Sequence, residues 1–358
     1  MGRGRLIALF AALLTLSTFV VAGWALFRES GIQANGAVDG ARGSGRPVVL
    51  VYEKAVAGSP SAPAWIWRAR ADGSHPVRLL RGRTPIVSPD GRTIAFTRTR
   101  QVTSGGATST LATLWLMRSD GSHARAVTRT AGGFGPIAWS PDSRTLLAGA
   151  SDGLRLIVRA QNSVRLLPGT EQSSSSGIEQ ASFAPDGQSI AYDRFDAAGT
   201  DVFSLSLDGG QPLQLTHDHE SFAPLWGPSK IAYQRGFIHG DIWLMDGDGQ
   251  QNDRLTHTAA GYYPAAWSES GRRLLGANPA SHNGRLWAVQ VTTGHARPLT
   301  RWVGDLFPQG FSRDGRLVYA AVGCGGTHSA FGWLETIPFS GGRPEVVVRG
   351  PCRGSWSA

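Results

Sequence analysis

The stretch that decides the fold runs from residue 83 to residue 130 and reads RTPIVSPDGRTIAFTRTRQVTSGGATSTLATLWLMRSDGSHARAVTRT. Its apolar run at 85–87 is followed by Ser88-Pro89-Asp90-Gly91, where proline presets φ and glycine accepts a positive φ, as a tight turn requires. Residues 93–97 and 114–117 are rich in β-branched and aromatic side chains, which predicts two strands with a Gly/Ser/Thr-rich loop between them. Asp120-Gly121 then predicts a hairpin turn into a fourth strand at 125–128.

This four-strand unit recurs with a period of about 40 to 48 residues, which is typical of the blades of a β-propeller. Complete copies begin near residues 83, 131, 178, 219, 260 and 303. Each repeats the turn between its first two strands, as at 139–143 (WSPDS) and 183–187 (FAPDG). An aromatic position also recurs in the third strand, and we expect its side chains in the core: Trp67, Trp115, Phe203, Trp243 and Trp287.

The two ends of the chain supply the remaining blade. Residues 48–80 match the second, third and fourth strands of the unit, but no first strand precedes them. The last residues, 354–358 (GSWSA), look like a first strand with nothing after it. We therefore predict an all-β propeller of seven four-stranded blades, with the closing blade shared by both termini, which leaves no long open sheet edge. Six or eight blades are the alternative if one weak copy, the third or the fifth, is misread.

The repeated pattern WSPDG-(x)-IAF … LWLM-x-x-DG … LT resembles the WD40-like propeller repeats of the TolB type, also called PD40 repeats. Similar repeats occur in the propellers of prolyl-oligopeptidase-type peptidases. The resemblance covers nearly all of the chain after residue 46 and implies a propeller, but this fold hosts many unrelated activities. TolB carries an extra α/β domain and the peptidases carry a hydrolase domain, and we expect neither domain in this sequence.

The first 30 residues include an uncharged run at 6–27 that is long enough to span a bilayer. Its length favours an uncleaved membrane anchor, and a signal peptide cleaved after the small residues near 20–22 is the alternative. Arg3 and Arg5 precede the run, so the positive-inside rule places the rest of the chain outside the cytoplasm, either tethered to the cell membrane or secreted. Residues 31–46 are Gly-rich and predict a flexible linker, and residues 47–358 predict the propeller domain.

The net charge is +9 and the pI is near 10.3, almost wholly from arginine, because Lys54 and Lys230 are the only lysines. The arginines are spread over every copy of the repeat, so we expect them to solvate strand edges and loops. Outside a cell, the anionic partners of a basic protein are lipid head groups, wall polymers or acidic glycans. No nucleic-acid partner is expected.

Functional side chains are expected on the face that carries the loops after the second and fourth strands, because the tight turns occupy the opposite face. The densest polar group there is 217–220 (HDHE). His-x-His beside carboxylates could hold a transition metal, although other copies place an arginine or a histidine in the first of these positions. The acidic stretch 246–253 lacks the spacing of an EF-hand loop and is predicted to be a hairpin turn. We predict a polar and aromatic ligand-binding surface formed by His217, His219, Glu220, Arg235, His239, His257, Tyr262, Tyr263, Trp302 and Asp305.

The sequence contains no G-x-S-x-G nucleophile elbow, no phosphate loop and no HExxH motif, so hydrolase chemistry of those types is not supported. Two classes of function follow. We expect a non-catalytic, monomeric scaffold that binds a protein, peptide or glycan at the loop-rich face and needs no cofactor. The alternative is a propeller enzyme, such as a polysaccharide lyase or a lactonase-like enzyme, that uses a divalent metal at the histidine cluster.

The two cysteines, Cys324 and Cys352, are predicted to form a disulfide, because an exported protein meets an oxidising environment. Both lie in loops of the last complete copy, on the same face. The bond would hold the chain where the ring closes and would contribute roughly 3 to 4 kcal/mol in the chain-entropy model. Two free thiols are the alternative.

Overall fold

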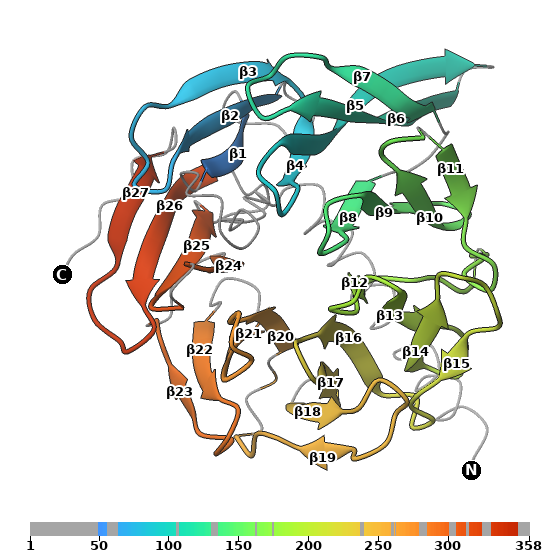
Figure 1. Ribbon diagram of the computed structural model, residues 1–358, viewed down its shortest axis with the longest axis vertical. Helices are drawn as coiled ribbons and strands as arrows, with labels where there is room; N and C mark the ends of the chain where they lie inside the picture. The colour runs from blue at the N-terminus through green and yellow to red at the C-terminus, as the bar shows by residue number, and fades with distance from the viewer. Residues whose placement is uncertain are drawn as a thin grey trace, which may run out of the picture.

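The computed structural model describes residues 49–55, 64–104, 107–129, 135–161, 163–173, 175–236, 240–258, 261, 263–278, 285–300, 306–312, 315–323 and 331–349. They form seven antiparallel sheets arranged in a ring (Figure 1). Six sheets have four strands, and the first, as described, has three. The predicted seven-bladed all-β propeller is therefore confirmed. The predicted closing strand at 354–358 and the predicted anchor at 6–27 lie outside the described residues.

Strands follow one another from the inside of the ring to its rim within each blade (Figure 1). Blade 1 comprises β1 (Val49–Ala55), β2 (Ala64–Arg70) and β3 (Val77–Arg81); blade 2, β4 (Arg83–Val87), β5 (Thr93–Ser104), β6 (Ala107–Arg118) and β7 (Arg125–Arg129); blade 3, β8 (Gly135–Trp139), β9 (Thr145–Ala150), β10 (Gly153–Val158) and β11 (Ser163–Leu166); blade 4, β12 (Ala181–Phe183), β13 (Ser189–Phe195), β14 (Thr200–Ser206) and β15 (Leu213–Gln214). Blade 5 comprises β16 (Ser221–Trp226), β17 (Ile231–Arg235), β18 (Asp241–Met245) and β19 (Asp253–Arg254); blade 6, β20 (Tyr263–Trp267), β21 (Arg273–Asn278), β22 (Arg285–Gln290) and β23 (Ala296–Pro298); blade 7, β24 (Leu306–Phe311), β25 (Leu317–Gly323), β26 (Phe331–Pro338) and β27 (Glu345–Arg349).

Among the residues with described positions, no helix is long and apolar enough to cross a membrane.

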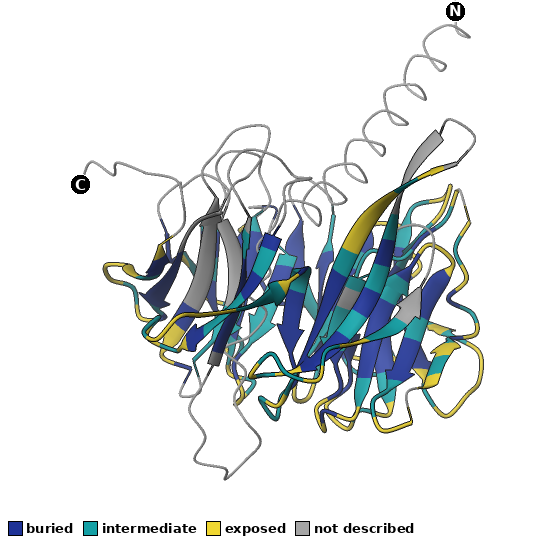
Figure 2. Ribbon diagram, turned by 90° about the horizontal axis from the view of Figure 1, so that it is seen from above, coloured by how far each residue is buried: buried dark blue, intermediate teal, exposed yellow. Residues whose placement is uncertain are grey.

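One predicted loop is instead a pair of long strands. A Gly/Ser/Thr-rich loop was predicted between the second and third strands of blade 2, but β5 and β6 pair continuously from Thr93↔Arg118 to Ser104↔Ala107. The physical reason is that threonine, which recurs through this segment, favours extended backbone. The resulting ribbon rises above the other sheets (Figure 2) and gives blade 2 a projection on the loop face.

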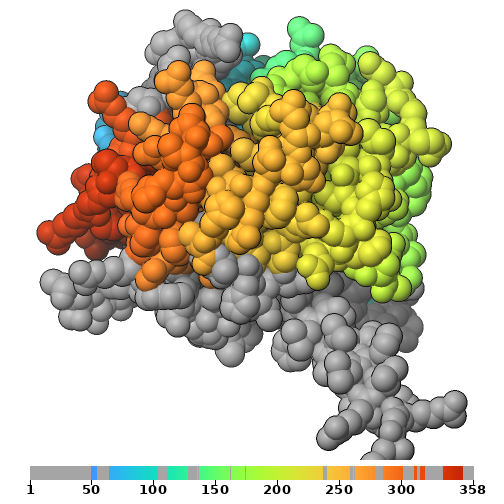
Figure 3. Space-filling view, turned by 90° about the horizontal axis from the view of Figure 1, so that it is seen from below, coloured from blue at the N-terminus to red at the C-terminus, as the bar shows by residue number. Residues whose placement is uncertain are grey.

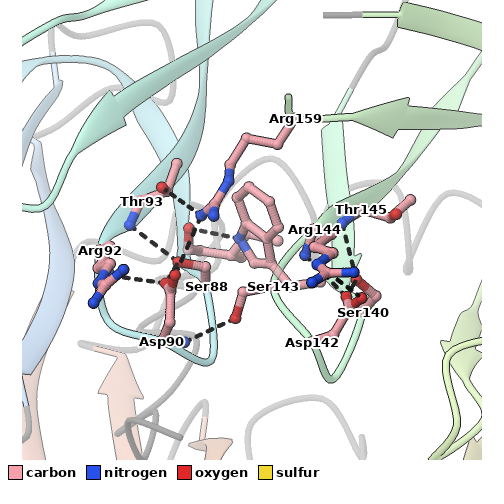
Figure 4. A network of polar contacts seen from close by, with 12 residues as sticks. Ser88, Asp90, Arg92, Thr93, Ser140, Asp142, Ser143, Arg144, Thr145 and Arg159 are labelled. Atoms are coloured by element: carbon pink, nitrogen blue, oxygen red, sulfur yellow. Dashed lines mark hydrogen bonds and ion pairs between the residues drawn. The ribbon is translucent and has the colours of Figure 1, made fainter. Parts of the chain in front are cut away.

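The tight turn on the opposite face is held by its own side chains (Figure 4). In blade 2, Ser88 Oγ donates to Asp90 Oδ1 (2.6 Å) and accepts from the Thr93 N–H (3.0 Å), while the Arg92 N–H also donates to Asp90 Oδ1 (3.0 Å). The same contacts recur in blade 3 through Ser140, Asp142, Arg144 and Thr145. The Ser-Pro-Asp-Gly pattern therefore encodes a side-chain network as well as a backbone turn.

Ser143 occupies the glycine position of the blade 3 turn and joins two blades. It keeps the left-handed backbone of that position, with φ of 64°, and its buried Oγ accepts from the Asp90 N–H of blade 2 (2.9 Å) (Figure 4). A left-handed conformation costs a non-glycine residue about 1 to 2 kcal/mol. The hydrogen bond between blades offsets that cost.

Proline recurs at irregular points of the innermost strands. Proline lacks an N–H and is tolerated on edge strands and at bulges. The innermost strand is an edge of its own sheet, so its repeated proline agrees with the observed topology. Bulges interrupt the pairing of β4, β8, β16, β20 and β24 at or beside Pro85, Pro136, Pro224, Pro264 and Pro308.

Apolar side chains pack mainly between neighbouring blades. Phe96 of β5, for example, packs with Val51 and Ile66 of blade 1 and has no exposed surface. Burial is highest in the middle of the strands and lowest at the turns (Figure 2). Because each sheet buries both faces in this way, no single blade has a complete core of its own.

The recurrent aromatic position of the third strand differs in part from the expected core. Phe203 is buried, but the four tryptophans at this position are only partly buried. The reason is that tryptophan is large and is therefore rarely buried completely. A cation from the second or third strand lies over each of the five rings. The pairs are Lys54 with Trp67, Arg98 with Trp115, Arg194 with Phe203, Arg235 with Trp243, and Arg285 with Trp287.

Several arginines that were expected to solvate loops join one blade to the next. Arg165 Nη2 of β11 donates to the Leu207 carbonyl of blade 4 (2.7 Å). Equivalent contacts run from Arg125 of blade 2 to the Arg159 carbonyl and from Arg297 of blade 6 to the Phe339 carbonyl. The blades lie side by side along the rim (Figure 3), so an arginine on the outermost strand can reach its neighbour. Part of the basic charge is therefore structural.

Candidate binding face

The loop face is built on a contact that recurs where the fourth strand ends. In blade 5, Thr256 Oγ1 donates to Asp241 Oδ1 (2.7 Å) and accepts from the Ile242 N–H (3.0 Å). Thr216 and Asp201 form the same pair in blade 4 (3.0 Å). All four side chains are buried. The threonines at the ends of the fourth strands thus fix the beginning of the third strands. Asp201 and Asp241 therefore have a structural role.

His219 of the predicted binding surface is anchored by the blade 4 aspartate. Its Nδ1 lies 2.8 Å from Asp201 Oδ2, and its N–H donates to Asp201 Oδ1 (3.1 Å). Its backbone is left-handed, with φ of 61°, and the Thr200 N–H donates to its carbonyl (3.1 Å). Such a conformation persists where several contacts determine it. The side chain remains 51% exposed, so His219 is held in place while still facing solvent.

The neighbouring carboxylate, Asp218, organises the rest of this loop. It accepts from the Glu220 N–H (2.9 Å) and from Ser221 Oγ (2.8 Å), and its Oδ2 lies 2.9 Å from Arg235 Nε. The Arg235 guanidinium in turn lies 4.7 Å from the centre of the Trp243 ring. Arg235, predicted to bind a ligand, therefore also has a structural role between β17 and the preceding loop.

The remaining predicted residues divide into exposed, packed and undescribed groups. His217, Glu220 and His257 are exposed on the loop face. Tyr263 packs beside the hydrophobic cluster of blades 6 and 7, and burial raises the pKa of its hydroxyl to about 12. The structure brings His217, His219, Glu220 and Arg235 into one loop region. His239, Tyr262, Trp302, Asp305, Cys324 and Cys352 lie outside the described residues.

The alternative function, a metal-dependent enzyme, requires a metal site at the histidine cluster of 217–220 (HDHE). Within the described ranges, no group of three or more His, Cys, Asp or Glu side chains is arranged to hold a metal ion. The turn prediction for 246–253 agrees with the hydrogen bonds, since the Gly249 N–H donates to the Asp246 carbonyl (3.0 Å) and the Gln250 N–H to Asp248 Oδ1 (3.1 Å).

A buried carboxylate outside the predicted binding surface links blades 4 and 5. Asp193 of β13 is 1% exposed. Its Oδ1 accepts from the N–H groups of Glu179 and Gln180 (3.0 and 2.7 Å), and its Oδ2 accepts from the Ala223 N–H of blade 5 (2.9 Å). Ala223 has a left-handed backbone with φ of 56°. Asp193 therefore secures the entry of the chain into the next innermost strand.

Glu53 makes the equivalent link between blades 1 and 2. Its Oε2 accepts from the Thr84 N–H (3.0 Å), and its Oε1 lies 3.1 Å from Arg83 Nη1. Thr84, like Ala223, has a positive φ (48°). Burial raises the pKa of Glu53 against the opposing effects of Arg83 and the Thr84 N–H. The sequence signal was a repeated aromatic–polar–cation triplet in the second strand, at 52–54, 96–98, 192–194 and 233–235.

The Asp241 contact predicts a dependence of stability on acid. Burial acts to raise the pKa of Asp241, but hydrogen bonds from Thr256 and Arg254 outweigh it and hold the pKa below its usual value. A depressed carboxylate pKa stabilises the fold above the unfolded-state value of about 3.9, and this contribution is lost as pH falls through the folded-state pKa. We expect the difference in unfolding free energy between wild type and Asp241→Asn to shrink below about pH 4. Urea denaturation at neutral and acid pH measures it, and a constant difference would contradict the assignment.

Comparison with known proteins supports the fold. No family model and no curated protein matches the sequence. TolB from Acinetobacter baumannii is 16% identical, with a TM-score of 0.52 over 82% of this chain and 77% of that chain. An oligogalacturonate lyase from Vibrio parahaemolyticus is 11% identical, with a TM-score of 0.56 over 85% and 86% of the two chains. The β-propeller domain of the Trilobed protease from Pyrococcus furiosus is 14% identical, with a TM-score of 0.59 over 86% and 96%.

These solved structures belong to proteins of different kinds: TolB, a lyase and a domain of a protease. Identities this low show a shared architecture and carry no activity from one chain to another. The chain is similar in fold to TolB and to other β-propellers.

Proposed function

We propose that this chain is an extracytoplasmic, membrane-tethered and monomeric propeller that binds a protein or peptide partner at its loop face without catalysing a reaction. The β5–β6 ribbon carries this proposal. It projects from the loop face, where the second and third strands of the other blades end close to the body (Figure 2). A projection of this kind adds accessible surface that the propeller itself does not need for closure.

The course of the chain supports the choice of face. β1 is the second strand of its blade, and Val49 pairs with Arg70 beside the turn that joins β2 to β3. The chain therefore enters the propeller on the turn face. A membrane anchor at 6–27 with a linker at 31–46 would hold that face nearer the membrane and leave the loop face pointing away from it.

The chemistry of the loop face supports binding over catalysis. Asp201, Asp218 and Asp241 each accept several structural hydrogen bonds. Carboxylates used in this way orient loops and are less available as general acids or bases. His217, Glu220 and His257 remain exposed for contact with a partner.

Shortening the β5–β6 ribbon tests the proposal. Thr99 pairs with Ala112, so replacing residues 100–111 by Asn-Gly keeps the register and closes the ribbon with a two-residue turn. We expect the shortened protein to fold with an almost unchanged melting temperature, because the removed part lies beyond the pairing with β4 and β7. It should lose the proteins that full-length wild type cross-links in membranes of its host, identified by mass spectrometry.

The matched control is the variant Arg92→Gln/Arg144→Gln, which changes two exposed side chains on the turn face. It should retain the cross-linked proteins. The proposal is wrong if the shortened protein cross-links the same proteins as wild type, or if wild type captures none above an unrelated propeller.

A further inference from the structure

Five cations gather on the rim of blades 1 and 2 beside the base of the β5–β6 ribbon. Trp65 of β2 pairs with Lys54 on β1 and with Arg81 on β3, so these side chains share one face of the sheet. Arg98 and Arg100 follow on β5, and Arg98 Nε donates to the Arg81 carbonyl (3.1 Å). We call Lys54, Arg78, Arg81, Arg98 and Arg100 the cationic rim.

The cationic rim lacks neutralising partners in the described part of the chain. None of its five side chains lies within ion-pair distance of a described carboxylate. Glu53, next to Lys54 in sequence, is buried and engaged by Arg83 and the Thr84 N–H. In blade 5, by contrast, Lys230, Arg235 and Arg254 each face an aspartate. Like charges held close together attract an anionic ligand.

Tryptophan rings hold these cations in position. The Arg78 and Arg81 guanidinium groups lie 4.3 and 5.2 Å from the centre of the Trp65 ring. Arg98 lies 4.0 Å from the centre of the Trp115 ring, and burial lowers the pKa of its guanidinium. Stacked guanidinium groups are more ordered than free ones, so they lose less entropy when they bind a carboxylate.

We propose that the cationic rim binds an acidic, extended polypeptide segment; this deepens the proposed function by giving the chemistry of its partner. Arginine forks match side-chain carboxylates. The ribbon also offers backbone to a polypeptide, because in the described residues β6 pairs with β7 no farther than Thr113↔Arg129, whereas its pairing with β5 continues to Ala107.

Two other anionic ligands fit the surface less well. A sugar chain needs open aromatic faces for stacking, and cations already cover Trp65, Trp67 and Trp115.

A flat bilayer can contact only cations that lie on one side of the protein. Arg78 and Arg81 lie on the sheet face of Trp65, whereas Arg98 shares the sheet face of Phe96, which packs against blade 1. The cationic rim therefore wraps around β3.

A binding measurement on the full-length protein in detergent tests the proposal. The probe is a fluorescein-labelled Glu-rich peptide, compared with the same peptide carrying Gln in place of every Glu. We expect only the Glu-rich peptide to raise the anisotropy, and added salt to weaken its binding. The variant Lys54→Gln/Arg78→Gln/Arg81→Gln should weaken binding by roughly tenfold. The variant Arg92→Gln/Arg144→Gln/Arg272→Gln, on the turn face, removes the same charge and should bind as wild type.

Equal weakening in the two triple variants would overturn the proposal, as would equal binding of the two peptides. Tighter binding of oligogalacturonate or of anionic phosphatidylglycerol vesicles would overturn the assignment to a polypeptide. The unfolding curves of both triple variants must match that of wild type. The double variant Arg78→Lys/Arg81→Lys should bind the Glu-rich peptide more tightly than the triple rim variant does. The rim variant keeps the whole ribbon, and the shortened ribbon keeps these three residues, so the two tests can fail separately.

Discussion

Replacing Gly73 by alanine is expected to lower the free energy of unfolding by roughly 3 to 5 kcal/mol. Gly73 lies in the turn between β2 and β3 with φ of 76°, and a Cβ there would overlap the carbonyl of Val347 in β27. An alanine at position 73 would have to keep a left-handed backbone that is unfavourable for it, and its methyl group would push blade 1 away from blade 7. Urea denaturation measures the loss, and hydrogen exchange should rise first in β3 and β27.

Gly91→Ala is the matched control. Gly91 has a similar φ of 67°, but a Cβ at this position would meet no atom within 4 Å. Its loss should be about 1 kcal/mol, from the left-handed backbone alone. Gly294→Ala should resemble Gly73→Ala, because its Cβ would overlap the Leu255 carbonyl of the preceding blade. Equal losses for Gly73→Ala and Gly91→Ala would show that contact between the blades is not the cause.

Asp193→Ala is expected to cost a similar amount, roughly 3 to 5 kcal/mol, because it leaves three backbone N–H groups without their acceptor. Two belong to the loop that leads into β12, and the third is the Ala223 N–H, which is buried between blades 4 and 5. The left-handed backbone of Ala223 would also lose its support. Equilibrium unfolding in urea gives the stability, and increased proteolysis between β15 and β16 would locate the opening.

Asp196→Ala provides the comparison for this prediction. Asp196 lies close to Asp193 in sequence, and its exposed side chain accepts a local hydrogen bond from the Ala198 N–H (2.8 Å). Its removal should cost less than about 1 kcal/mol. Asp193→Asn should fall between the two, since the amide keeps one oxygen acceptor. If Asp193→Ala were no more damaging than Asp196→Ala, the link between the blades would contribute little.

The loop face shows where local patterns failed. The sequence predicts the second and third strands of blade 2 but not their continuation as the β5–β6 ribbon, because the glycines and serines among the threonines favour a loop. His217 and His219 lie on the loop between β15 and β16. The sequence did not reveal that Asp201 anchors His219 or that Asp218 holds Arg235, since these partners lie on separate strands.

The sequence by itself determined the number of blades, the order of their strands and the turns on one face. These features depend on interactions within a few residues, such as Ser88 with Asp90, and the same pattern recurs in successive copies of the repeat. Only the tertiary structure decided how the blades meet: Gly73 against Val347, Asp193 on Ala223, and arginines on the carbonyls of the next blade. The reason is that each of these contacts joins two copies of the repeat, and its energy depends on the distance between their backbones, which no local pattern specifies.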